Sequence, residues 1–419
     1  MVGVAVLLSA DRRRIDWRLV GMGLALQAVF GVIVLKTAAG KAFFDAVGRV
    51  VTGLLRFQEE GARFVFGNLV QHTVPVGTPG PGGVDTSVGF VAQTGAFFAF
   101  NVLPTIIFFS ALMTVLYHLG VMQLVVKGIA WVMQKTLRTS GAETLSASGN
   151  IFLGQTEAPL LIKPFVGAMT ASELNTVMVG GFATVAGGVL AAYVGMLSGY
   201  FPDIAGHLLA ASVMNAPAGL LLSKILVPET GEPVTRDSLH IEVEKRDANV
   251  IGAAASGAAQ GLQLALNVGA MLMAFIALVA LLNAGLGWVG SLWGQEGLSL
   301  QWVLGQLLRP LAWVMGVPWQ DTAYVGGLIG IKASLNEFVA YSQLGADLTR
   351  GIALQPRSVV ICTYALLGFA NFSSIAIQIG GIGGLAPERK GEIARLGLKA
   401  MVAGNLAAFT SASIAGMLL

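Results

Sequence analysis

Long apolar segments alternate with short polar ones along most of the chain. About 20 apolar residues suffice for a helix to cross a bilayer. The pattern therefore predicts an all-α polytopic membrane protein, with the end of a first helix at residues 1–8. Further spanning helices are predicted over residues 17–35, 96–117, 174–197, 204–226, 254–286, 358–379 and 393–419.

The segments between them are amphipathic or polar. Residues 42–70 alternate apolar and charged side chains at helical spacing, which is typical of a helix lying along a membrane surface. Residues 121–133 and 302–314 are shorter amphipathic segments. Residues 74–89 are rich in Pro and Gly and are expected to form an aqueous loop. Residues 228–249 form a polar, charged loop, which is the clearest internal boundary.

The composition agrees with a membrane protein and excludes other classes. Only 11% of the 419 residues are charged, and the mean hydropathy is +0.75. No basic run with interleaved aromatic residues indicates nucleic-acid binding. Neither a His-Glu-x-x-His metal motif nor a Gly-x-Ser-x-Gly nucleophile motif occurs, so nothing in the chain indicates an enzyme.

The two halves of the chain echo each other. Each contains a short amphipathic segment, a polar segment with one acid, and an apolar helix interrupted by Gly and hydroxyl residues, at 180–188 and 368–374. Such pairs predict inverted repeats, with a binding site where the broken helices meet. Lys and Arg at 12–14, 228–249 and 389–390 face the cytoplasm if both polar segments are re-entrant hairpins entering from opposite sides. The C-terminus is then external.

The lone acids are Glu157 and Glu337. An ionised group at membrane depth costs at least a few kcal/mol, so such residues usually face a cavity and have a function there. Pro159 breaks the first segment, and a turn in the membrane is tolerated where its carbonyls line a cavity or bind a cation. Two structural alternatives are ion pairs of Glu157 with Lys163 and of Glu337 with Lys332.

The polar clusters favour a neutral ligand. Gln155, Thr156 and Glu157 offer mixed donors and acceptors, with no adjacent cation to hold an anion. Glu337 can accept two donors at once, as from a vicinal diol, and Asn371 can both donate and accept. A nucleoside fits both clusters, although a sugar or a polar amide fits this chemistry as well.

Three motifs resemble signatures of the concentrative nucleoside transporters, and they occur in the family's order. They are Gly154-Gln-Thr-Glu-Ala-Pro-Leu160, Asn336-Glu-Phe-Val-Ala-Tyr-Ser342 and Gly368-Phe-Ala-Asn-Phe-Ser-Ser-Ile375. The resemblance implies sodium-coupled nucleoside import by an elevator motion, in a homotrimer embedded in the lipid bilayer of the bacterial inner membrane. It also implies a scaffold at 1–119 and 250–300, the cytoplasmic loop at 228–249, and a moving transport domain at 120–227 and 301–419.

The resemblance further assigns site residues by motif. Glu337 on the second hairpin, with Asn371 and Ser374, would hold the ribose. The residues implied at the base are Gln155, Thr156 and Glu157, with Val189 and Phe369 packing near it. The residues implied to coordinate the co-transported sodium, largely through carbonyls, are Asn150, Leu153, Thr156, Thr184 and Val185.

Three alternatives come from other mechanisms. Some bacterial relatives use protons, in which case Glu157 or Glu337 would carry the proton. An intramembrane enzyme would use the two acids as a pair, and a channel would need neither an ion site nor two alternating halves.

Overall fold

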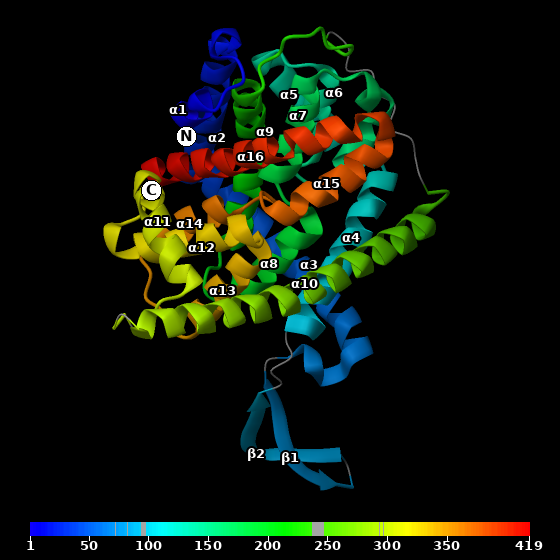
Figure 1. Cartoon of the computed structure of the whole chain (residues 1–419). Coiled ribbons are helices and arrows are strands. Elements are labelled where there is room, and N and C mark those ends of the chain that lie inside the picture. Colours follow the sequence, from blue (N-terminus) through cyan, green and yellow to red (C-terminus); the bar gives the residue numbers. More distant parts are fainter. Residues whose placement is uncertain (72, 82, 94–97, 237–246, 293, 296) are drawn as a thin grey trace.

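The computed structural model describes residues 1–71, 73–81, 83–93, 98–236, 247–292, 294, 295 and 297–419, and most of them are helical (Figure 1). Within this part of the chain, six helical segments are long and apolar enough to cross a bilayer. They are Trp17–Lys36, Phe98–His118, Ala171–Leu197, Ile204–Leu226, Val250–Leu292 and Pro387–Leu418. The predicted span at 358–379 is divided into two short helices by a break, as its Gly and hydroxyl residues indicate.

The N-terminal region begins with the short helix α1 (Val2–Leu7), followed by α2 (Trp17–Lys36) and α3 (Ala38–Phe66). Asp16 caps α2, because its carboxylate accepts hydrogen bonds from the backbone N–H groups of Arg18 and Leu19. Thr37 ends α2 and starts α3, since its hydroxyl accepts from the N–H of Gly40 at 3.1 Å. The predicted amphipathic helix is confirmed, with its start four residues earlier.

The predicted loop at 74–89 is wrong. The chain forms strands β1 (Thr73–Gly80) and β2 (Gly83–Gln93), paired antiparallel from Thr73 opposite Gln93 to Gly80 opposite Gly83. Figure 1 shows this two-stranded sheet projecting away from the helical body. The Pro and Gly residues suggested turns, but Val and Thr recur between them and favour strands. Proline is compatible with a two-stranded sheet because every strand there is an edge strand.

The helix α10 (Val250–Leu292) is longer than predicted and packs against α4 (Leu103–His118), which follows a π-helical turn at Phe98–Val102. Two glycines on α10 allow this close approach. A Cβ on Gly257 would lie 2.6 Å from the hydroxyl of Thr114, and one on Gly261 would lie 2.7 Å from the Cα of Ile107. Any larger residue at these positions would push the two helices apart.

The remaining elements form two sets in the same order, which agrees with the predicted repeats. Each set contains an amphipathic helix, a hairpin, a broken helix and a long final helix. The first set is α5 (Val121–Leu137), α6 (Gly141–Gly149), a 3-10 segment (Ala158–Ala168), α7 (Ala171–Ala183), α8 (Gly187–Leu197) and α9 (Ile204–Leu226). The second is α11 (Leu300–Val314), α12 (Thr322–Ser334), α13 (Glu337–Thr349), α14 (Pro356–Leu366), α15 (Phe372–Leu385) and α16 (Lys390–Leu418).

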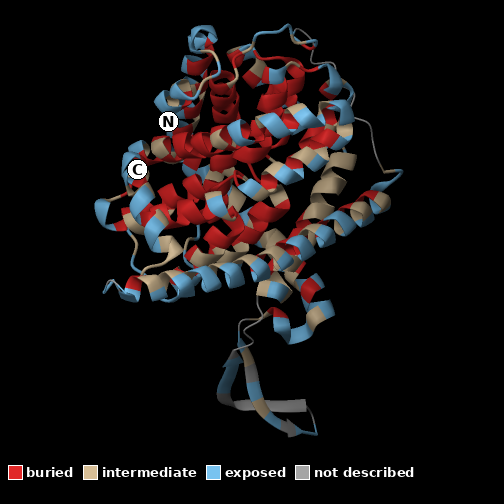
Figure 2. Ribbon diagram, viewed as in Figure 1, coloured by how far each residue is buried: buried red, intermediate tan, exposed pale blue. Residues whose placement is uncertain are grey.

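The core lies between these two sets. Figure 2 shows buried residues concentrated on α7, α8, α9 and α16 in the middle of the body, whereas α10 along its edge is mostly exposed. The final helices α9 and α16 both pack against α7, so the broken helix of the first set is enclosed. Polar groups at its break are therefore hidden from bulk water.

Candidate functional site

The first helix break separates α7 from α8 at residues 184–186. Thr184 leaves the helix in an extended conformation, and its hydroxyl donates to the carbonyl of Gly180 at 2.8 Å. The N–H of Gly187, where α8 begins, donates to the carbonyl of Phe152 at 2.9 Å. Phe152 lies in the turn between α6 and the 3-10 segment. The break of the first set is thus joined to the turn of the first hairpin.

The second break separates α14 from α15 at residues 367–371. Gly368 has a φ of +111°, and a Cβ there would lie 2.6 Å from the carbonyl oxygen of Phe182 on α7. The N–H of Phe369 donates to the carbonyl of Thr184 at 3.3 Å. The two breaks therefore touch, and glycine is required at the point of closest approach because it has no side chain.

A chain of hydrogen bonds runs from one hairpin to the other through this junction. The amide nitrogen of Gln155, in the first hairpin, donates to the hydroxyl of Ser374 at 3.2 Å. Asn371 caps α15, accepting from the N–H of Ser374 at 3.0 Å and donating its amide to a carboxylate oxygen of Glu337 at 2.9 Å. The other oxygen of Glu337 accepts from the hydroxyl of Tyr193 at 3.1 Å. We call Gln155, Ser374, Asn371, Glu337 and Tyr193 the inter-hairpin chain.

All five members of the inter-hairpin chain are less than a tenth exposed. These hydrogen bonds bring residues separated by more than 200 positions into one polar row. Glu337 has only neutral donors in this row. Its two carboxyl oxygens therefore lie next to neutral polar groups that a small ligand could replace.

Two members of this polar region were missed from the sequence. Tyr193, on α8, stacks on Tyr341 of the second hairpin with ring centroids 4.3 Å apart. Gln378 lies one turn after Ser374 on α15 and donates to the side-chain oxygen of Gln155 at 3.1 Å. The spacing of Ser374 and Gln378 on one helical face was a usable signal, whereas Tyr193 stands alone in an apolar helix.

Glu157 lies apart from the inter-hairpin chain. It is partly exposed, and its carboxylate accepts from the N–H of Gly154 at 3.1 Å. It borders a cavity of about 810 Å³ between α4 and α10 on one side and the first hairpin and α8 on the other. The cavity is lined by Met113, Leu153 and Gln260, among others, and reaches Asp247 at the end of the polar loop.

The residues expected at sodium gather around the first break. Asn150 ends α6, and its side-chain oxygen is buried with no hydrogen-bond partner. Its amide nitrogen lies 3.0 Å from where a Cβ on Gly180 would be. Thr184 and Val185 are buried at the break itself, and Thr156 and Leu153 are half-buried in the hairpin turn. An unpartnered buried oxygen beside a helix C-terminus suits a small hard cation.

The other residues expected at the substrate occupy the same region. Val189 is buried two residues into α8, and Phe369 is half-buried in the second break. Among the described residues, neither of the alternative ion pairs, Glu157 with Lys163 or Glu337 with Lys332, is formed. Among the described residues, no group of three or more His, Cys, Asp or Glu could hold a metal ion.

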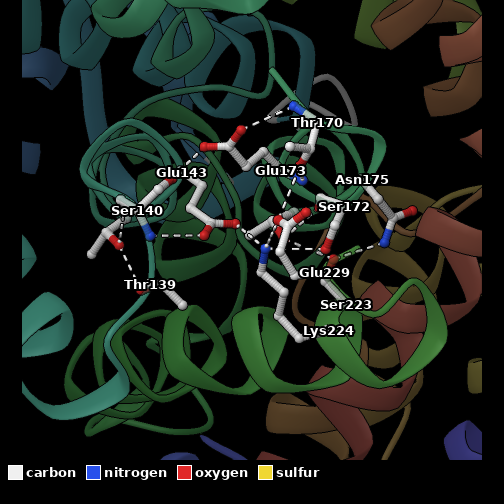
Figure 3. A network of polar contacts seen from close by, with 12 residues as sticks. Thr139, Ser140, Glu143, Thr170, Ser172, Glu173, Asn175, Ser223, Lys224 and Glu229 are labelled. Atoms are coloured by element: carbon white, nitrogen blue, oxygen red, sulfur yellow. Dashed lines mark hydrogen bonds and ion pairs between the residues drawn. The ribbon is translucent and has the colours of Figure 1, made fainter. Parts of the chain in front are cut away.

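A second polar group lies where α6 and α7 begin and α9 ends (Figure 3). Lys224 forms ion pairs with Glu143 at 2.9 Å and with Glu229 at 3.0 Å. Glu173 joins through Thr170, which accepts from the N–H of Glu173 and donates its hydroxyl to Glu229. We call Glu143, Glu173, Lys224 and Glu229 the root cluster, because they lie at the base of the first hairpin. The sequence did not reveal it, since its members are spread over residues 143–229.

Three sequence models of protein families match the chain. The "Na+ dependent nucleoside transporter N-terminus" matches residues 1–69, and the "Na+ dependent nucleoside transporter C-terminus" matches residues 207–416. A model described as "Nucleoside recognition" matches residues 99–200, which include the first hairpin. The matches thus cover both helix breaks and both hairpins.

Relatives and solved structures agree with these matches. An uncharacterized transporter of Bacillus subtilis is 46% identical over 100% of this chain and 96% of its own length. The mouse sodium/nucleoside cotransporter 1 is 41% identical over 98% of this chain, which spans 61% of the mouse protein. The structure of CNTnw in an inward-facing substrate-bound state is 44% identical, with a TM-score of 0.87, covering 100% of this chain and 95% of that one. A variant of CNTnw in an outward-facing state has the same TM-score.

Proposed function

Because the chain belongs to the Na+-dependent nucleoside transporters, we propose that it imports nucleosides across the bacterial inner membrane by coupling their entry to sodium. The family consists of transporters and not enzymes, so the two acids are not a catalytic pair. The observation that carries the proposal is the inter-hairpin chain, which places both hairpins at one polar row in the centre of an apolar body.

Glu337 is the residue that holds the ribose in this proposal. Its carboxylate already accepts from Tyr193 and Asn371, so a vicinal diol can present the same kind of donors in the same place. Asn371 and Ser374 complete the ribose site from the start of α15. Gln155, Thr156 and Glu157 contact the base from the first hairpin, while Val189 and Phe369 pack against its ring.

Sodium lies at the first break, held by Asn150 and Thr184 with carbonyls of the hairpin and the break. The carbonyl-rich end of α7 carries a partial negative charge that favours a cation. Leu153, Thr156 and Val185 supply the remaining backbone or hydroxyl oxygens. A neutral nucleoside gains nothing from the membrane potential alone, whereas one co-transported charge contributes about 2.3 kcal/mol per 100 mV.

The transport movement is an elevator motion of 120–227 and 301–419 against the scaffold. The cavity between α4 and α10 and the first hairpin supports this division, because it lies along the boundary that would slide. The exposed face of α10 supports assembly into a homotrimer, since a long apolar helix on the outside of the body can pack against another copy. The polar loop 228–249 would lie in the cytoplasm, and its residues 237–246 fall outside the described part of the chain.

The test is concentrative uptake of a labelled nucleoside into proteoliposomes under an inward sodium gradient at constant pH. Choline replaces sodium in the control, and an Asn150→Leu variant removes the proposed amide ligand while keeping the branched shape of the side chain. We expect uptake above equilibrium with sodium only, and a higher sodium requirement for the variant. Equal uptake in choline that a protonophore abolishes would overturn sodium coupling and assign the role to protonation of Glu157, which borders the cavity.

A further inference from the structure

The final helix of each set donates a hydrogen bond to the helix break of its own set. Asn215 on α9 donates its amide to the carbonyl of Ala183 at 2.7 Å, at the first break. Asn405 on α16 donates its amide to the carbonyl of Ala370 at 2.9 Å, at the second break. The side-chain oxygens of both asparagines are buried and unpartnered. The halves therefore share one arrangement, in which a buried asparagine binds a carbonyl that the break leaves free.

The two halves differ in the residue that the first helix of the hairpin places near the break. In the first half the hairpin helix α6 has no basic residue in its last turn and ends at the neutral Asn150. In the second half α12 carries Lys332 in its last turn. The ammonium of Lys332 donates to the carbonyls of Ala365 at 2.9 Å and Leu367 at 3.1 Å, at the C-terminal end of α14.

Lys332 is fully buried, and among the described residues no carboxylate forms an ion pair with it. Its ammonium also lies over the Phe409 ring, 5.6 Å from the ring centre, and the face of an aromatic ring attracts cations. An ammonium held by the last carbonyls of a helix occupies the negative end of the helix dipole. Carbonyl oxygens in this arrangement are the ligands that a sodium ion would otherwise use.

We propose that Lys332 is a built-in cation of the second half. Its ammonium binds the free carbonyl oxygens of the second break, as sodium binds those of the first break. The inference rests on the proposed sodium site at the first break. A second sodium ion at the second break would need the carbonyl oxygens that Lys332 binds, and the ammonium of Lys332 would repel the ion at short range. We therefore expect one sodium ion to accompany each nucleoside.

The first measurement uses the unaltered protein. In proteoliposomes held at a fixed membrane potential, the charge moved is compared with the labelled nucleoside taken up. We expect one charge per nucleoside and a Hill coefficient for sodium near one. Two charges per nucleoside would overturn the inference while leaving sodium-coupled transport intact. If uptake were independent of sodium, the proposed function would fail, and the inference would fail with it.

The second measurement removes the built-in cation. Lys332→Met keeps an unbranched apolar side chain of nearly the same length without the ammonium, Lys332→Arg keeps the charge, and Lys399→Met at an exposed position of α16 is the matched control. We expect Lys332→Met to lose uptake at low sodium and to recover it at high sodium, with a Hill coefficient rising toward two as a second ion takes the vacated carbonyls. Lys332→Arg and the control should keep a coefficient near one. A folded Lys332→Met protein with unchanged sodium dependence would overturn the inference, and if this variant does not fold, the charge ratio of the unaltered protein decides.

Discussion

The root cluster and the inter-hairpin chain both bury carboxylates, but they satisfy them differently. In the root cluster, Glu143 and Glu229 bind the ammonium of Lys224, so charge meets charge. In the inter-hairpin chain, Glu337 binds only the neutral donors of Tyr193 and Asn371. A carboxylate paired with a buried cation stabilises the fold and is not free to bind a ligand. A carboxylate that accepts hydrogen bonds from neutral donors can accept hydrogen bonds from a ligand instead.

The positions of the two groups fit this distinction. The root cluster joins the beginnings of α6 and α7 to the end of α9, where the elements must stay together if the first hairpin is to move as a unit. Thr235 adds to this joint, since its hydroxyl accepts from the N–H of Ala142 at 3.1 Å. The inter-hairpin chain instead crosses between hairpins. Substitutions in the root cluster should therefore change stability, and substitutions in the inter-hairpin chain should change binding.

The largest expected effect is on stability, from Lys224→Met. The side chain of Lys224 is 8% exposed, and its removal leaves Glu143 and Glu229 without their cation. Breaking a buried ion pair by removing one partner costs about 3–5 kcal/mol. We expect thermal unfolding of the purified protein at a markedly lower temperature, with nucleoside affinity unchanged at temperatures where it is folded. An unfolding temperature equal to that of Lys399→Met would contradict a stabilising role.

Glu337→Gln should have the opposite profile. The glutamine amide would turn a donor toward Tyr193 or Asn371 and lose the charged acceptor, at a cost to nucleoside binding of roughly 2–5 kcal/mol. Unfolding temperature should change little, because no cation loses its partner. Isothermal calorimetry at saturating sodium measures the affinity, and Glu232→Gln at an exposed position outside the proposed site is the control, for which no loss is expected.

A second comparison identifies the group that Glu337 binds. In the unaltered protein a 3′-deoxynucleoside should bind more weakly than its parent nucleoside. In Glu337→Gln that difference should shrink, since the acceptor is already lost. If the parent and the 3′-deoxy compound bound the unaltered protein equally well, Glu337 would not hold the ribose.

The residues that the sequence assigned to one ligand lie in local motifs. Gln155, Glu337, Asn371 and Ser374 were all expected near one ligand, and three hydrogen bonds now join them. Their motifs contain helix breakers and polar residues in an apolar setting, which is a local signal. Tyr193 gave no such signal, because its role depends on meeting Glu337 from another helix.

The root cluster could not be predicted for a related reason. Its four members belong to α6, α7, α9 and the segment after α9, and each alone is typical of a charge at the membrane surface. Only the packing of α6 and α7 against α9 turns them into one network. Similarly, the alternative ion pair of Glu337 with Lys332 was considered because the two residues are close in sequence. In the structure, the ammonium of Lys332 instead donates to carbonyls of the second break.

A smaller effect is expected at the other end of the inter-hairpin chain, from Gln155→Ala. Gln155 donates to Ser374 and accepts from Gln378, so its loss leaves the amide of Gln378 with the carbonyl of Met178 alone. Loss of a buried polar partner costs about 1–3 kcal/mol. If Gln155 contacts the base, the order of affinity among nucleosides should change more than the affinity for ribose. Equal weakening of all nucleosides would argue that it does not read the base.

The smallest effect concerns pH and the root cluster. Burial raises the pKa of Glu229. The ammonium of Lys224 and hydrogen bonds from Gly231, Thr170 and Lys224 lower the pKa by more than burial raises it, so the net pKa lies below its ordinary value of 4.5. A lowered pKa in the folded state means that the ionised carboxylate stabilises the fold above the ordinary value. That contribution is lost as the pH falls through the lowered pKa.

Stability of the unaltered protein should therefore decline on acidification from about pH 5 downward, and Glu229→Gln should make this decline shallower. The variant begins from a lower stability at neutral pH, because the amide cannot replace the charge beside Lys224, and the two curves should converge in acid. The unfolding temperature across this pH range measures both features. Glu232→Gln is the matched control, since Glu232 is an exposed neighbour on the same segment and should leave the acid decline unchanged. Parallel curves for Glu229→Gln and the unaltered protein would mean that Glu229 does not contribute its charge to the root cluster, and the comparison would then rest on Glu143 and Lys224 alone.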